Sequence, residues 1–329
     1  MKEAKAIGEA PRGKGRGLGR FASAFLFFLA FASSAFAQQH GELKVFMPGP
    51  AVTMLPVHVA MVRGFDKEAG FTTALTQTAG AIGVKAMIAG DFDFGMSAGS
   101  ALTAAVNGAP VRIIYAHVAK SLFYFYAQDG LTDVKQLEGK KIGVDAIGGS
   151  QDIAARLAMR AGGANPANAV FLGMGFKQIP GAMIAGALDA AVITPPTDLQ
   201  LINSGKKFVK LGFLGDYQRS LTGGLATTEN MIKRRPEAVR AFVRAHYKAH
   251  QFILKERDET IRIMAKYLSI SEADARLTYD ELIGHYTKTG AIAAEDQKTM
   301  IDDQVKALNL KRSPAASEIF VFSFVNEIK

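Results

Sequence analysis

Cysteine is absent from all 329 residues of the chain. Without it there is no disulfide framework, no thiol nucleophile, no thiolate zinc site and no cysteine for an N-terminal lipid anchor. Tryptophan is absent too, so any aromatic stacking on a ligand must come from Phe or Tyr. Hydrophobic residues make up 49% of the chain and charged residues 21%, which is a globular composition and excludes the disordered and fibrous classes.

The N-terminus has the pattern of an export signal. Basic residues between Lys2 and Arg20 precede an apolar run from Phe21 to Phe31, and Ala35-Phe36-Ala37 follows as a small-x-small cleavage site. A membrane anchor is the alternative, but a span needs about 20 apolar residues and this run is roughly half that length. We therefore predict that residues 1–37 are a signal peptide, cleaved after Ala37.

Much of the positive charge belongs to that peptide. The formal charge of the chain is +9, and removal of residues 1–37 leaves 33 basic and 28 acidic residues, or +5. Nucleic-acid binding thereby loses its main support, and we expect no nucleic-acid partner. The remaining positive balance fits the attraction of small anions.

An internal repeat organises the rest of the chain. Met87-Ile88-Ala89-Gly90 recurs 96 residues later as Met183-Ile184-Ala185-Gly186, and each copy is followed at the same distance by an aspartate, Asp93 or Asp189. Around both copies, short apolar strands alternate with amphipathic helices, which is the pattern of a parallel, doubly wound sheet. Two sheets of this size favour two α/β lobes with a ligand cleft between them.

The crossings between the lobes set the predicted domains. The aromatic segment from Leu122 to Ala127 is the first crossing, and a segment near Tyr217 to Ala226 is the return. Lobe one is therefore predicted to comprise 38–122 and 226–329, and lobe two 123–225. Arg235-Pro236-Glu237 begins an amphipathic helix, and this helix with the shorter helical stretches after it should pack on the first lobe.

The candidates for catalysis and metal binding are weak. Gly95-Met96-Ser97-Ala98-Gly99 matches the G-x-S-x-G pattern of a hydrolase, but the later histidines have no partner motif, and a contact loop or helix capping by Ser97 is favoured. His246 and His250 are four residues apart on a predicted helix, with no third ligand evident, so a half-buried helix face is favoured. We predict no catalytic residue, no metal and no cofactor.

Small polar residues gather where predicted strands end and helices begin. Parallel sheets present ligands at this edge, where free backbone N–H groups and positive helix ends can hold an anionic group. His58 on the first helix and Tyr124 on the crossing strand could supply walls. The predicted ligand-binding residues are Pro50, Thr53, His58, Ser97, Ala98, Ser100, Tyr124, Ser150, Gln151 and Thr194.

Several segments together carry a family resemblance. The chain resembles the nitrate-, sulfonate- and taurine-type periplasmic binding proteins, a group that also resembles the thiamine-pyrimidine synthase of yeast. The Cys-rich segment of that synthase is missing, which removes its activity, and His58 stands where the family has an aromatic or large residue. The segments are Pro56–Ala60, Gly64–Gly70, Ala89–Asp93, Leu137–Val144 and Arg235–Phe242.

The resemblance implies a type II periplasmic binding fold that closes on one ligand and delivers it to an ABC permease in the inner membrane. It also implies a periplasmic location, and we expect a monomer. Tyr, Phe and His in the lining suggest a small organic anion, such as a sulfonate or carboxylate that could be aromatic, rather than bare nitrate. Two alternatives stay open: a cofactor-free or serine-dependent periplasmic enzyme on the same fold, and a ligand-binding partner of a membrane sensor.

Overall fold

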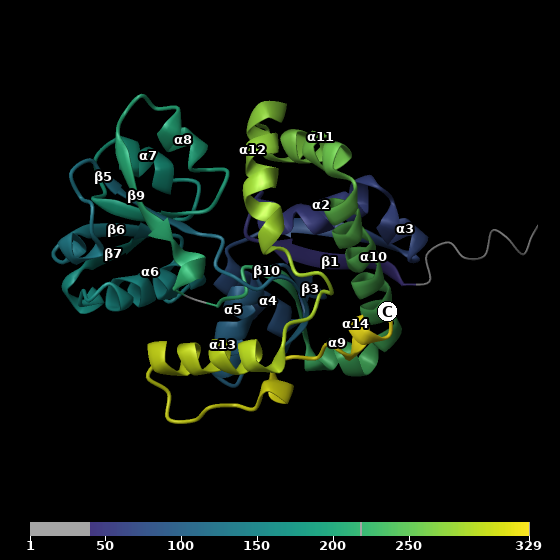
Figure 1. Cartoon of the computed structure of the whole chain (residues 1–329). Coiled ribbons are helices and arrows are strands. Elements are labelled where there is room, and N and C mark those ends of the chain that lie inside the picture. Colours follow the sequence, from purple (N-terminus) through teal and green to yellow (C-terminus); the bar gives the residue numbers. More distant parts are fainter. Residues whose placement is uncertain (1–39, 218, 329) are drawn as a thin grey trace, which may run out of the picture.

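The described residues of the computed structural model are 40–217 and 219–328, and they form two five-stranded sheets, each in a body of its own (Figure 1). The predicted signal peptide lies outside the described residues. We call the body around the first sheet lobe 1 and the body around the second lobe 2. The two α/β lobes of a periplasmic binding fold are as predicted.

Lobe 1 contains the sheet with strand order β2-β1-β3-β10-β4. Its strands are β1 (Gly41–Met47), β2 (Phe71–Gln77), β3 (Phe94–Gly95), β4 (Val111–Val118) and β10 (Gly223–Thr228). The helices between them are η1 (Val52–Met54), α2 (Leu55–Val62), α3 (Phe65–Glu68), α4 (Gly80–Ala89) and α5 (Ala98–Val106).

Lobe 2 repeats the plan with strand order β7-β6-β8-β5-β9. Its strands are β5 (Tyr124–Gln128), β6 (Lys141–Val144), β7 (Val170–Gly173), β8 (Ala190–Ile193) and β9 (Phe208–Phe213). Its helices are α6 (Ser150–Ala161), α7 (Ile179–Ile184) and α8 (Leu199–Ile202), with short 3-10 turns η2 (Val134–Leu137), η3 (Pro166–Asn168) and η4 (Leu214–Asp216).

The prediction of parallel sheets needs one correction. Strand β10 runs antiparallel to both β3 and β4, and β5 runs antiparallel to both β8 and β9. Each is the strand that the chain enters from the other lobe, so it is not reached by the crossover helix that parallel neighbours require. The return crossing also lies earlier than the predicted boundary between 225 and 226, because Gly223 already pairs with Val118 in lobe 1.

The sequence repeat is visible in the hydrogen bonds. Asp93 Oδ2 accepts from the Lys44 amide at 2.8 Å while the Asp93 amide donates to the Lys44 carbonyl at 2.9 Å. Asp189 makes the same two bonds with Lys141, at 2.8 and 3.0 Å. Each aspartate therefore ties the start of the third strand of its unit to the first, which explains why the repeat keeps it.

The C-terminal helices pack on lobe 1, as predicted. They are α9 (Glu229–Arg234), α10 (Pro236–Lys255), α11 (Arg257–Leu268), α12 (Glu272–Leu282), η5 (Ile283–His285), α13 (Ala294–Ala307), η6 (Ala316–Glu318) and α14 (Ser323–Asn326). Helix α10 buries Val239, Phe242 and Val243 in the core, with Phe242 stacked on Phe94 at a ring distance of 4.0 Å. A buried side chain of this kind stabilises the fold by about 1.5–3 kcal/mol.

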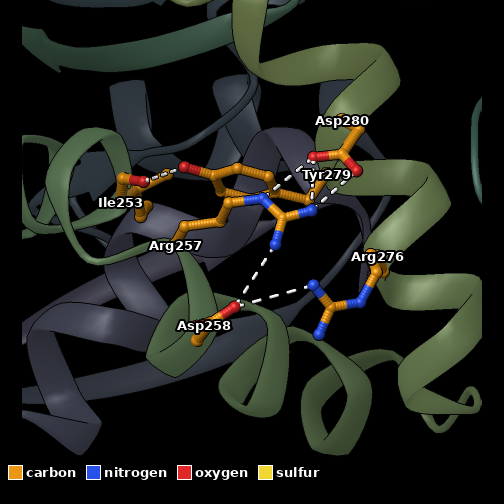
Figure 2. Close-up of polar contacts among 6 residues, drawn as sticks. All are labelled: Ile253, Arg257, Asp258, Arg276, Tyr279 and Asp280. Carbon is orange, nitrogen blue, oxygen red and sulfur yellow. Dashed lines mark hydrogen bonds and ion pairs between the residues drawn. The ribbon is translucent and has the colours of Figure 1, made fainter.

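A polar network fixes α12 against α11 (Figure 2). The Arg257 guanidinium donates to both carboxylate oxygens of Asp280, at 2.7 and 2.9 Å, and Asp258 lies between Arg257 and Arg276. The Tyr279 hydroxyl donates to the Ile253 carbonyl at 2.8 Å. This anchoring sets the position of α12, which lies on the side of lobe 1 that faces lobe 2 (Figure 1).

Candidate functional site

Two adjoining cavities lie in the cleft between the lobes. The first is about 70 Å³ and is lined by loops that follow β1, β3, β6 and β8, together with residues of both crossings. The second, about 270 Å³, continues from it and shares Pro48, Asp145 and Phe176 with it. The residues lining the first cavity are Pro48, Gly49, Ala51, Thr53, Met54, Ser97, Gly99, Phe123, Asp145, Ser150, Gln151, Phe176, Thr194, Leu221 and Thr222.

The lobes touch across this cleft. A Cβ atom added at Gly49 of lobe 1 would lie 2.5 Å from the Phe176 ring of lobe 2, and one added at Gly99 would lie 3.1 Å from Ser150 Cβ. Such distances leave no room for a side chain at either glycine. The structure is therefore that of the closed cleft, and both glycines permit the approach.

Two helices begin at the first cavity, one from each lobe. Helix α5 starts after Ser97 and α6 starts after Gly149, and neither helix has a side-chain cap. The first N–H groups of a helix have no partner within the helix, and the helix dipole adds partial positive charge there. The opposing helix ends can therefore hold an acceptor or anionic group without a formal countercharge.

A hydrogen-bonded chain organises the wall of lobe 2. The Asp145 amide donates to Gln151 Oε1 at 2.9 Å, and Gln151 Nε2 donates to the Thr194 hydroxyl at 3.1 Å. The Asp145 carboxylate itself accepts from the Ala146 amide at 2.8 Å. Burial raises the pKa of the Asp145 carboxyl to about 6, and the bond from Ala146 offsets this only in part.

Six of the ten predicted binding residues line the cleft. Five face the first cavity, and Ser100 faces the second; the Ser97 hydroxyl also donates to Ser100 Oγ at 3.1 Å. Thr53 and Thr194 are 141 positions apart in the sequence, and the fold brings the loops that carry them to the same cavity. Their contact with a ligand stays a prediction. The five are Thr53, Ser97, Ser150, Gln151 and Thr194.

The other four lie elsewhere. Ala98 is fully buried against the sheet of lobe 1, and Pro50 follows the two loop residues that line the cleft. His58 stacks on Tyr267 of α11 at 4.2 Å, because it lies a turn into α2, away from the end that meets the cleft. The Tyr124 hydroxyl donates to Glu281 of α12, on the other face of the second sheet.

The residues of the first cavity that the sequence analysis missed include two aromatic side chains and one acid, Phe123, Phe176 and Asp145. Phe123 precedes Tyr124 in the aromatic segment from Leu122 to Ala127, and it is Phe123, not Tyr124, that lines the first cavity. Asp145 directly follows β6 (Lys141–Val144), and an acidic residue at a strand end is a signal that the sequence analysis could have used. Phe176 lies in an irregular loop whose path no periodicity indicates.

The described residues form neither a catalytic triad nor a metal site. Ser97 has Ser100 as its hydrogen-bond partner, and no group of three or more metal-binding side chains is found in the described chain. His246 and His250 lie in the core of lobe 1 instead, with His117. His117 Nδ1 is 3.2 Å from His246 Nε2, and His250 Nδ1 is 2.7 Å from the Tyr115 hydroxyl.

Burial favours the uncharged form of these three histidines at neutral pH. Burial, reinforced by His250, lowers the pKa of His117 to about 3, and burial lowers the pKa of His250 to about 4. Burial and the two neighbouring rings lower the pKa of His246 well below its usual value. His117 Nε2 lies 2.7 Å from the carbonyl of Thr53, which lines the first cavity, so the histidine cluster also holds this part of the cleft wall in place.

One family model and several curated proteins are similar to this chain. The family model described as NMT1/THI5 like matches residues 52–260. A Brucella abortus protein named as a binding protein is 26% identical over 225 residues, which cover 65% of this chain and 70% of that protein.

Two solved structures share the fold. The alkanesulfonate-binding protein SsuA from Xanthomonas axonopodis pv. citri, bound to MOPS, has a TM-score of 0.71 at 19% identity and covers 85% of this chain and 98% of its own. The periplasmic nitrate-binding protein NrtA from Synechocystis has a TM-score of 0.71 at 15% identity, with 89% of each chain covered. In the described part of this chain, no helix is both long and apolar enough to cross a membrane.

Proposed function

The chain belongs to the NMT1/THI5-like family, and on that premise we propose that it is the substrate receptor of an ABC importer. It is exported to the periplasm by its signal peptide, acts as a monomer, captures a small organic anion between its lobes and presents the closed complex to a permease in the inner membrane. The relatives named as sulfonate- and nitrate-binding proteins support this reading.

One observation carries the proposal: uncapped helix N-termini from opposite lobes meet at one closed cleft. A ligand group that accepts hydrogen bonds is then held by both lobes at once. The ligand therefore shifts the equilibrium toward the closed form, by the difference between its binding free energies for the closed and the open form. The alternative of a serine-dependent enzyme gains no support, because the Ser97 hydroxyl is paired with Ser100 and has no histidine partner among the described residues.

The function is tested by a thermal-shift screen of sulfonates, carboxylates, nitrate and pyrimidines on the mature protein. A ligand that binds only the folded state raises the melting temperature, and 100 times its Kd in free ligand stabilises the fold by about 2.7 kcal/mol. We expect organic anions to raise it. A screen in which no small molecule shifts the melting temperature would contradict the proposal.

Closure is tested with Gly99→Val. A Cβ at Gly99 would lie 2.9 Å from the Leu221 carbonyl and 3.1 Å from Ser150 Cβ, so valine holds the lobes apart. We expect at least a tenfold loss of affinity and no ligand-induced compaction in small-angle scattering, whereas the wild type contracts. Gly181→Val is the matched control, because it also lies in the first turn of a helix but has nothing within 4 Å of an added Cβ. No compaction of the wild type on ligand binding would count against closure, and equal compaction in all three proteins would count against a close approach of the lobes at Gly99.

A further inference from the structure

The cleft carries an acidic group where an anion receptor would be expected to carry none. Asp145 is the one charged residue among those that line the first cavity, and it lines the second cavity as well. Lys177 is the other charged residue of the second cavity and is exposed at its edge. A ligand that only accepted hydrogen bonds would place its negative charge beside this carboxylate.

The Asp145 carboxylate is positioned to accept further hydrogen bonds. Its backbone is fixed on both sides, because its amide donates to Gln151 and its carbonyl accepts from the Gly175 amide at 3.0 Å. Its side chain accepts a hydrogen bond from the Ala146 amide at 2.8 Å. An ionised carboxylate has about four acceptor positions, so capacity remains for a donor in the cleft.

Neighbouring charges do not neutralise this carboxylate. Asp152, on the adjoining helix α6, is itself an acid and accepts from the Gly148 amide at 2.8 Å and from Arg156 at 2.7 Å. Arg156 is therefore paired with Asp152. Lys177 lines the second cavity but not the first, and no ion pair joins it to Asp145 within the described chain. No cationic side chain of the described residues therefore pairs with Asp145.

We propose that the ligand bears an N–H group that donates to the Asp145 carboxylate, so that the receptor selects N–H-bearing organic acids over counterparts without that group. The inference rests on the proposed function: the acidic group of the ligand lies at the ends of α5 and α6, and its N–H group lies at Asp145. Phe123 and Phe176 line the same cavity and provide apolar walls for the body of the ligand. The N–H group is either an alkylammonium or an uncharged aromatic amine.

Matched ligand pairs separate these two sources. In one arm β-alanine is compared with propionate, and in the other 4-aminobenzoate with benzoate and 4-aminobenzenesulfonate with benzenesulfonate, all by calorimetry at pH 7.5. We expect the aminated member of at least one arm to bind tenfold or more tightly than its counterpart. The arm that shows the preference identifies the kind of N–H group. Equal affinities within every pair that binds would overturn this inference alone, whereas no binding by any acid would overturn the proposed function as well.

The variant Asp145→Asn tests the residue itself. Its preference for the aminated ligand should fall at least fivefold, while Asp129→Asn, which removes the same charge from an exposed turn of lobe 2, should leave the preference unchanged. The unliganded melting temperature of each variant reports whether it is folded.

A pH series on the wild type gives a second, independent readout. From pH 5 to 7.5 the aminated ligand should bind more tightly as Asp145 ionises, and the non-aminated acid more weakly. Asp152 and Lys177 are the other charged groups that face this region. Parallel pH profiles for both ligands, or a preference that Asp145→Asn leaves intact, would overturn the assignment.

Discussion

The two lobes share a scaffold but not the chemistry of their cleft walls. Asp93 and Asp189 make the same paired backbone bonds in the two lobes. The polar side chains at the lobe 1 wall are hydroxyls such as Ser97, whereas lobe 2 offers the Asp145 carboxylate and the Gln151 amide. The repeat has therefore kept what the sheets need, and the loops have diverged where a ligand is held.

The two lobes also differ in the number of histidines that they contain. All six histidines of the chain lie outside residues 123–225, so lobe 2 has none. Three of those in lobe 1 are buried and neutral. Acid should therefore act on the two lobes unequally, and this difference gives the largest effect that we expect.

Lowering the pH should unfold lobe 1 first. His117 has a folded pKa of about 3 and His250 of about 4, against 6.5 in an unfolded chain. The unfolded state therefore binds more protons below pH 6.5. The stability that the neutral histidines provide is complete above that pH, and it is lost as the pH falls toward their folded pKa values. Each such histidine can remove up to about 1.4 kcal/mol per pH unit in this window, so the total loss at pH 4 is several kcal/mol.

Hydrogen exchange with mass spectrometry at pH 7 and pH 4.5 measures this difference lobe by lobe. We expect peptides from α10 and β4 to lose protection before peptides from β6 and β8. His246→Leu should reduce the pH dependence of the unfolding free energy, measured with denaturant, by close to one proton between pH 4 and 6. Simultaneous loss of protection in both lobes, or an unchanged slope in the variant, would refute the unequal response.

The contrast between lobes also explains how much the sequence could predict. The repeat and the strand-to-helix alternation predicted both lobes. The loops at the cleft could be predicted from one rule, that the carboxyl ends of parallel strands lie at the same edge of a sheet. This rule does not depend on which side chains the loops carry.

Other features could not be predicted from the sequence, for physical reasons. The direction of β5 depends on the path of the chain between the lobes, which is a tertiary property. The same path decides that Phe123, and not Tyr124, lines the cleft. His58 was assigned to the cleft because α2 starts near it, but only its stacking on Tyr267, 209 positions later in the sequence, decides which way it faces. Such contacts leave no local signal.

The shared scaffold should respond equally to loss of its paired aspartates. Asp93→Ala and Asp189→Ala each leave a strand amide without its carboxylate acceptor, which costs about 1–3 kcal/mol. Asp93 also lies 3.5 Å from Arg235, but an ion pair this exposed adds less than about 1 kcal/mol. Denaturant unfolding of both variants should give losses within about 1 kcal/mol of each other. A large loss in one lobe only would show that the repeat is a similarity of sequence and not of energetics.

The smallest expected effect is at the second contact between the lobes, on α12. Glu281 of lobe 1 accepts from the Tyr124 hydroxyl and lies 3.3 Å from Lys210, both of lobe 2. Glu281→Gln keeps an acceptor for Tyr124 and removes the attraction to Lys210. Because both charged side chains are about 40% exposed, the pair contributes less than about 1 kcal/mol.

That contribution exists only in the closed form, so it should appear in ligand affinity and not in folding stability. A closed form weakened by this amount lowers affinity by the same factor, about fivefold at most. Calorimetry on Glu281→Gln should show this loss at low salt and less of it at high salt, while Glu295→Gln, the same change at an exposed position of α13, shows none. If Glu281→Gln lowered the melting temperature without changing affinity, the contact would belong to the fold of the lobes, and closure would depend on the cleft loops alone.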